Sequence, residues 1–161
     1  MARPLSEEKR QALLDAAAEL VASLGTSAPT AKIAKAAGVS EGTLFTYFST
    51  KDDLLNQLFL EIEANLAETM LAPYPASVSA EHRLFAVWNR LIDWGLAHAT
   101  ALKALRQLKV SDRITPESRS QCHTMLRDAR TMVEECLADH AAPDRINFYI
   151  DTILFDLADT S

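Results

Sequence analysis

Residues 30–51 hold the side chains whose types and spacing could bind a polyanion. The segment combines hydroxyl groups, which donate and accept hydrogen bonds, with lysines, which supply positive charge. Phosphate oxygens are natural partners for such donors, and glycine lets a backbone approach a ligand closely. The candidate DNA-binding residues are Thr30, Lys32, Lys35, Ser40, Glu41, Gly42, Thr43, Thr46, Tyr47 and Lys51.

Two short helices joined by a glycine turn are expected to position these side chains. Thr30 is expected to cap the first helix, and Gly38 permits a left-handed turn after it. Ser40 is expected to cap the second helix, whose inward face carries Leu44 and Phe48, four residues apart. Two short helices around such a turn form a helix-turn-helix, in which the second helix enters the DNA major groove.

The run from Ile33 to Leu54 resembles the signature of TetR-type transcriptional regulators. It reads IAxxAGVSxGTLFxYFxxKxxL, and the resemblance covers residues 8–60. It implies an all-α fold, with an N-terminal three-helix helix-turn-helix domain and a larger C-terminal helical domain for ligand binding and dimerisation. It also implies a homodimer that binds a palindromic double-stranded DNA operator and a small-molecule effector. The expected function is repression, relieved when the effector favours a shape that does not fit the operator.

The resemblance also assigns roles to individual residues. Thr43 and Tyr47 match positions that contact phosphate or nearby bases. Lys51 matches a phosphate-contacting lysine at the start of a helix, and Thr30 matches a capping residue near the DNA backbone. Phe45 stands where tyrosine is frequent in the family, which removes one hydroxyl.

Other roles follow from the chemistry of the side chains. Lys32 and Lys35 are phosphate candidates because of their charge. Gly42 allows close approach to the groove, and the methyl group of Thr46 could contact a thymine methyl. Glu41 would repel phosphate but could accept a hydrogen bond from a cytosine amine.

Composition sets limits on the class of protein. The chain has 161 residues, 48% of them hydrophobic, and a net charge of -6, which fits a globular protein with a core. Residues 1–51 carry six basic and five acidic residues, so the positive charge is relatively concentrated there. No stretch is long and apolar enough for a membrane span, and we expect a cytoplasmic protein without a membrane partner. Cys122 and Cys136 lie too far apart along one helix for a disulfide.

Apolar periodicity predicts helices throughout the chain. The expected ranges are 6–24, 51–71, 78–98, 100–110, 117–140 and a last helix after residue 143. Pro73 and Pro75 mark the best domain boundary. We therefore expect a DNA-binding domain at 1–51, a connecting helix at 51–71 and an effector-binding and dimerisation domain at 72–161.

The second domain supplies candidates for an effector pocket and a dimer face. The aromatic, histidine and methionine residues that could line the pocket are Phe85, Trp88, Trp94, His98, His123, Met125 and Met132. The apolar residues that could form the dimer face are Phe148, Ile153 and Phe155. The simpler interpretation makes the aromatic residues and methionines core packing and the histidines structural.

Alternative functions remain open at this stage. Tyr47 could merely pack, and Lys51 could be a solvated lysine. The chain has no glycine-rich phosphate loop, Gly-x-Ser-x-Gly or Cys-x-x-Cys motif, and its histidines show no metal-binding spacing. We therefore expect no enzyme, no cofactor and no metal. The competing functions are a helical protein-interaction module without DNA binding and, less favoured, a small helical enzyme.

Overall fold

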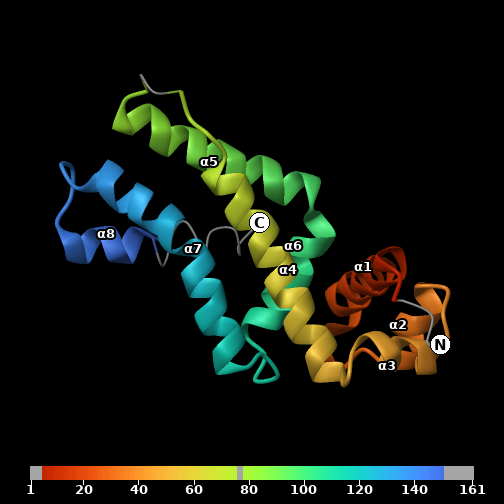
Figure 1. Ribbon diagram of the computed structural model, residues 1–161. Helices are drawn as coiled ribbons and strands as arrows, with labels where there is room; N and C mark the ends of the chain where they lie inside the picture. The colour runs from red at the N-terminus through yellow and green to blue at the C-terminus, as the bar shows by residue number, and fades with distance from the viewer. Residues whose placement is uncertain (1–4, 76–77, 151–161) are drawn as a thin grey trace. The chain divides into compact units, whose positions relative to one another are not determined.

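The computed structural model describes residues 5–75 and 78–150, which form α-helices and contain no strand (Figure 1). The helices are α1 (Glu7–Leu24), α2 (Thr30–Ala36), α3 (Glu41–Tyr47), α4 (Lys51–Leu71), α5 (Ala80–Ala97), α6 (Ala99–Lys109), α7 (Pro116–Leu137) and α8 (Pro143–Tyr149), and a 3-10 turn, η1 (Gly25–Ser27), follows α1. The all-α prediction is confirmed. None of these helices has both the length and the apolar character needed to cross a bilayer.

Local capping signals set the two ends of α1. The Ser6 side chain accepts a hydrogen bond from the backbone N–H of Lys9, and two glutamates occupy the first turn. Acidic side chains are favourable there because the free N–H groups make this end of a helix positive. At the other end Gly25 has a φ of 74°, a backbone conformation that favours glycine. The bounds of α1 agree with the helix expected at 6–24.

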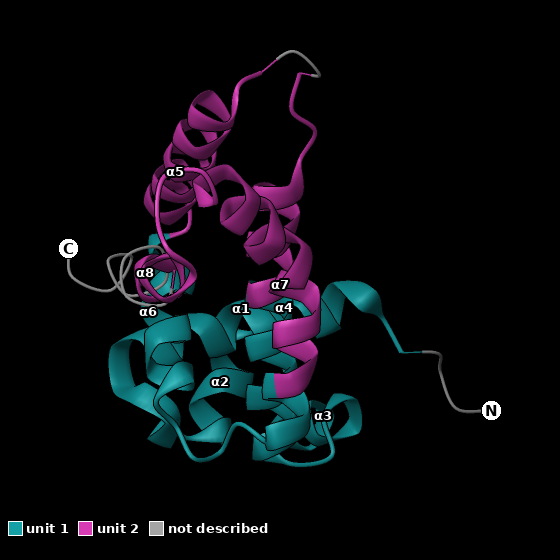
Figure 2. Ribbon diagram, turned by 90° about the vertical axis from the view of Figure 1, so that its left-hand side faces the viewer, with its two compact units in different colours: residues 1–62, 99–119 teal, residues 63–98, 120–161 magenta. Residues whose placement is uncertain are grey.

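The chain divides into two compact units (Figure 2). The first contains residues 1–62 and 99–119, and the second contains residues 63–98 and 120–161. Both α4 and α7 therefore begin in the first unit and end in the second. These units differ from the domain boundary predicted at residue 72, because residues 99–119 pack in the first unit; the functional domains stay a prediction.

The position of α6 accounts for this division. This helix packs against α1 and η1 inside the first unit. Its inward face consists of Ala104, Leu105 and Leu108, which are almost completely buried. Burial of apolar area contributes roughly 25 cal/mol per Å², so this face gains more by covering α1 than by facing water. Helix α1 thus shares its core with a segment from the middle of the chain.

In the second unit, Arg90 on α5 holds the segment that follows α4. Its guanidinium donates to the backbone oxygen of Ala72 at 2.6 Å and to that of Pro73 at 3.0 Å. It also lies over the Tyr74 ring, 3.9 Å from the ring centroid, in a cation–π contact. These contacts fix the chain reversal at the proline-containing segment.

Helix α7 contributes a buried stripe to the second unit. Cys122, Ala129, Val133 and Cys136 on this stripe are buried. The helix is continuous between the two cysteines, and no disulfide joins them, as the sequence spacing predicts. Burial raises the pKa of the Cys136 thiol, which disfavours the reactive thiolate. These cysteines therefore act as small apolar packing residues.

Candidate nucleic-acid interface

Helices α2 and α3 form a tight helix-turn-helix. Gly38 between them has a φ of 73°, as expected, and Val39 N–H donates to the Ala34 carbonyl at 3.0 Å. That bond is typical of a Schellman motif, which ends a helix with a left-handed residue. Ser40 then caps α3 by accepting from the Thr43 N–H at 3.1 Å. The turn and the second cap agree with the sequence prediction.

The inner face of α3 anchors the motif. Leu44 on α3 and Phe48, which directly follows the helix, have no exposed surface. Thr43 and Tyr47 are half-buried, whereas Glu41, Gly42 and Thr46 are exposed. The Thr46 hydroxyl donates to the Gly42 carbonyl at 3.1 Å. The helix thus buries one side and presents the side that the sequence predicted would face DNA.

The start of α2 differs from the expectation. Pro29, and not Thr30, occupies the N-cap position, because Pro29 has extended backbone angles and Thr30 is already helical. The Thr30 hydroxyl instead donates to the Glu41 carboxylate at 2.5 Å. This bond links the first residues of α2 and α3, a relationship that connects positions 11 residues apart. Glu41, which looked unfavourable beside phosphate, thus has a structural partner within the motif.

Tyr47 connects α3 to α1. Its hydroxyl oxygen accepts a hydrogen bond from the backbone N–H of Ser6 at 2.9 Å. A phenol hydroxyl can accept and donate at the same time, so its own hydrogen stays available to an external acceptor. Tyr47 therefore makes a polar contact between α3 and the start of α1, and its DNA contact stays a prediction.

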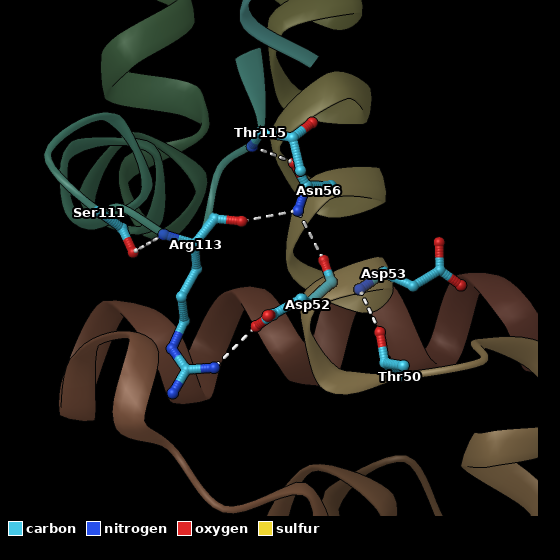
Figure 3. Close-up of polar contacts among 7 residues, drawn as sticks. All are labelled: Thr50, Asp52, Asp53, Asn56, Ser111, Arg113 and Thr115. Atoms are coloured by element: carbon cyan, nitrogen blue, oxygen red, sulfur yellow. Dashed lines mark hydrogen bonds and ion pairs between the residues drawn. The ribbon is translucent and has the colours of Figure 1, made fainter. Parts of the chain in front are cut away.

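Lys51 is the first residue of α4 and is half-buried. Burial and, secondly, the positive charge of Arg113 lower the pKa of its ammonium group. The first turn of the helix is fixed by Thr50, whose hydroxyl accepts from the Asp53 N–H at 3.0 Å (Figure 3). A lysine on this turn lies beside backbone N–H groups that favour an anion.

Lys32 and Lys35 are exposed on α2. Their phosphate-binding role rests on charge and stays a prediction.

Sequence reasoning missed a polar cluster that joins α4 to the segment between α6 and α7, residues 110–115 (Figure 3). Asn56 on α4 donates to the backbone oxygens of Asp52 and Arg113, and its own oxygen accepts from the Thr115 N–H. The Arg113 guanidinium pairs with the Asp52 carboxylate at 2.7 Å. The bonds that join α4 to this segment connect residues 57 to 61 positions apart, so no local signal could have revealed them.

The candidate pocket residues lie on α5 and α7 or directly after α5, in different environments. Trp94 is buried, and its indole N–H donates to the Asn65 side chain at 2.7 Å. The His98 ring stacks on Trp94, with ring centroids 5.2 Å apart. Phe85, Trp88 and His123 are exposed, and Met125 and Met132 are half-buried. Their pocket role stays a prediction.

The predicted dimer face is only partly described. Phe148 on α8 is 63% exposed, and its dimer role stays a prediction. Ile153 and Phe155 lie outside the described residues. Among the residues that the structure describes, no three histidine, cysteine or acidic side chains are grouped to hold a metal ion.

Comparison with known proteins shows which proteins the helix-turn-helix region is similar to. The sequence profile described as "Bacterial regulatory proteins, tetR family" matches residues 13–58, which span α2, α3 and parts of α1 and α4. The chain is 35% identical over 105 residues to the fatty acid metabolism regulator protein of Bacillus subtilis. That match covers 62% of this chain and 54% of the relative, so the chain spans about half the length of this relative.

Solved structures extend the similarity beyond the helix-turn-helix. A TetR family transcription regulator from Marinobacter aquaeolei VT8 has a TM-score of 0.81 at 25% identity, covering 94% of this chain and 80% of its own. The transcriptional regulator FadR from Bacillus subtilis, in complex with stearoyl-CoA, has a TM-score of 0.65 at 25% identity, covering 80% and 69%. The names of these relatives describe regulators of transcription, which favours that function over an enzyme.

Proposed function

We propose that this chain, which belongs to the tetR family of bacterial regulatory proteins, binds operator DNA through α2 and α3 and represses transcription until a small molecule releases it. The observation that carries this proposal is the outward side of α3. Leu44 and Phe48 fix the helix from within, while Gly42, Thr46 and Tyr47 stay on its accessible side. A short helix held this way can enter a major groove and expose base-reading side chains.

Charge supports the same surface. The whole chain has a net charge of -6, which alone would disfavour DNA. The DNA-binding helices contain exposed lysines on α2 and a lysine at the start of α4, where phosphate contacts are needed. Phosphate contacts supply most of the non-specific affinity of such proteins, and base contacts supply the specificity.

We further propose that the active form is a homodimer on a palindromic operator. Two recognition helices match two half-sites only when they lie about 34–36 Å apart, one turn of DNA. An effector that prefers another spacing would weaken both half-sites together. The exposed Phe148 supports a dimer face on α8. The mass of the protein in solution, measured by light scattering at micromolar concentration, tests this proposal.

The experiment that tests DNA binding titrates the protein against labelled duplex DNA from upstream of its own gene and against a randomised pool. Lys51→Ala is compared with Lys103→Ala, which removes the same charge from an exposed position on α6. Saturable binding that Lys51→Ala weakens and Lys103→Ala leaves intact supports the proposal. If the wild type binds neither DNA, the helix-turn-helix has no DNA-binding function.

The effector is tested on the same complex. FadR from Bacillus subtilis was crystallised with stearoyl-CoA, which makes that compound a reasonable first probe. Release of the DNA by stearoyl-CoA, but not by coenzyme A alone, would identify a long-chain acyl thioester as an effector. Retention of the DNA would exclude this class.

A further inference from the structure

The segment between α6 and α7 is bound firmly to the beginning of α4. Asn56 is only 8% exposed and uses its amide on three backbone groups (Figure 3). Its nitrogen lies 2.7 Å from the Asp52 oxygen and 2.9 Å from the Arg113 oxygen, and its oxygen lies 2.9 Å from the Thr115 nitrogen. Between these two attachment points Ile114 is buried. The backbone of Arg113 is thus fixed without any help from its own side chain.

The Arg113 side chain is placed beside the proposed phosphate contact. Its Nη1 atom lies 2.7 Å from an Asp52 carboxylate oxygen, and Asp52 directly follows Lys51. The two paired side chains are 43% and 55% exposed, so water reaches both. Burial and, secondly, the positive charge of Arg113 lower the pKa of the Lys51 ammonium group.

We propose that Arg113 is a DNA-backbone contact supplied from outside the helix-turn-helix, which binds the phosphodiester beside the one held by Lys51. This inference rests on the proposed DNA-binding function. A guanidinium carries five N–H donors in a fixed fork, so one edge can hold Asp52 while another donates to phosphate. Asp52 limits the rotamers of Arg113, and Asn56 is the positioning residue that places its backbone.

A simpler role for Arg113 would be to neutralise Asp52, which would otherwise repel DNA beside Lys51. The two roles give different results when the carboxylate is removed. If Arg113 only neutralises Asp52, Asp52→Asn makes Arg113 dispensable. If Arg113 binds phosphate, its loss weakens DNA binding whether or not the carboxylate is present.

The salt dependence of DNA binding measures the contact directly. Each neutralised phosphate contributes about 0.9 to the slope of log K against log salt concentration. DNA binding is titrated between about 50 and about 200 mM salt, on upstream DNA and on a randomised duplex pool. The proteins compared are the wild type, Arg113→Ala, Arg113→Lys, Asp52→Asn and the double variant Asp52→Asn/Arg113→Ala. Arg127→Ala is the charge-matched control, because Arg127 forms an exposed ion pair with Asp128 on α7.

We expect Arg113→Ala to reduce the slope by about 0.9 per chain on both DNAs, because a phosphate contact is independent of sequence. Over a fourfold rise in salt concentration, the difference in DNA affinity between this variant and the wild type should therefore shrink by about 3.5-fold per contact. Arg113→Lys should keep the slope, the control should match the wild type, and the double variant should have a lower slope than Asp52→Asn. Thermal melting of each variant verifies that it is folded.

Other results overturn the inference. Equal slopes for Asp52→Asn and the double variant would show that Arg113 only neutralises a carboxylate. If folded Arg113→Ala has the same salt-dependence slope as the wild type, Arg113 makes no phosphate contact. The proposed function would still stand in that case, because the wild type binds DNA. Absence of wild-type binding to either DNA would overturn both proposals.

Discussion

The backbone N–H of Ser6 donates a hydrogen bond to the Tyr47 hydroxyl at 2.9 Å, which joins the cap residue of α1 to the last residue of α3. Ser6 also caps α1 with its side chain. Ser6 therefore caps the start of α1 and also holds the Tyr47 hydroxyl, which is a predicted DNA contact. The orientation of Tyr47 depends on the N-terminal helix as well as on its own helix.

Tyr47→Phe tests this relationship. The substitution keeps the ring and removes the hydroxyl, so the Ser6 N–H loses its acceptor and DNA loses a donor. We expect the free energy of unfolding to fall by about 0.5–1.5 kcal/mol, the usual net value of one hydrogen bond. DNA affinity should fall further than stability alone explains, because nearly all of the protein stays folded. Urea denaturation and DNA titration of the same samples measure both effects, and unchanged DNA affinity would contradict the second.

Gly38→Ala should destabilise the protein through the backbone alone. Gly38 has a φ of 73°, and a Cβ built there meets no atom within 4 Å. The added methyl group causes no clash, so the loss is the cost of a left-handed alanine, about 1–2 kcal/mol. Gly38→Asn is the matched variant and should lose less, because asparagine tolerates this conformation better. Urea denaturation gives both values, and equal losses for the two variants would rule out this explanation.

Local signals predicted much of the helix-turn-helix. The turn at Gly38 and the cap formed by the Ser40 side chain involve residues within five positions of each other, and both have the predicted roles. The burial of Leu44 also follows from its spacing on one helix face. Caps, turns and helix faces can be predicted because both partners of each interaction lie close together in the sequence.

Relationships between distant residues could not be predicted in this way. The Thr30 hydroxyl bonds Glu41 instead of capping its own helix, because the turn brings the starts of α2 and α3 together. The assignment of 99–119 to the first unit depends on α6 covering α1. Periodicity shows that α6 has an apolar face but does not identify the helix against which that face packs.

Asn56→Ala should detach the segment between α6 and α7 from α4. The substitution leaves the N–H of Thr115 and the backbone oxygen of Arg113 without their side-chain partner. Because both residues are exposed, water can replace the lost partner, and each lost bond costs about 0.5–1.5 kcal/mol, the usual net value of a hydrogen bond. We expect the variant to be less stable than the wild type. Its hydrogen exchange should increase more at the Thr115 amide than at the α1 amides.

Asn56→Asp is the matched variant for this prediction. It has nearly the same shape and keeps an acceptor for Thr115, but it loses both donors and adds charge near Asp52. Thr115 should therefore keep more of its protection in Asn56→Asp than in Asn56→Ala. Equal protection of Thr115 in the wild type and Asn56→Ala would show that the bond does not hold the segment.

Glu61 on α4 should make the folded protein less stable as the pH rises. Burial raises the pKa of its carboxyl group above the ordinary value of 4.5, although a hydrogen bond from Gln11 partly opposes this. The folded state therefore binds the proton more tightly than the unfolded chain, and the free energy of unfolding contributed by Glu61 falls as the pH rises from 4.5 through the raised pKa. Glu61→Gln keeps a polar side chain without this ionisation. We expect the variant to be more stable than the wild type at neutral pH, and the difference to shrink below the ordinary pKa. Urea denaturation across this pH range measures the difference, and a pH-independent gap between the two proteins would refute the assignment to Glu61.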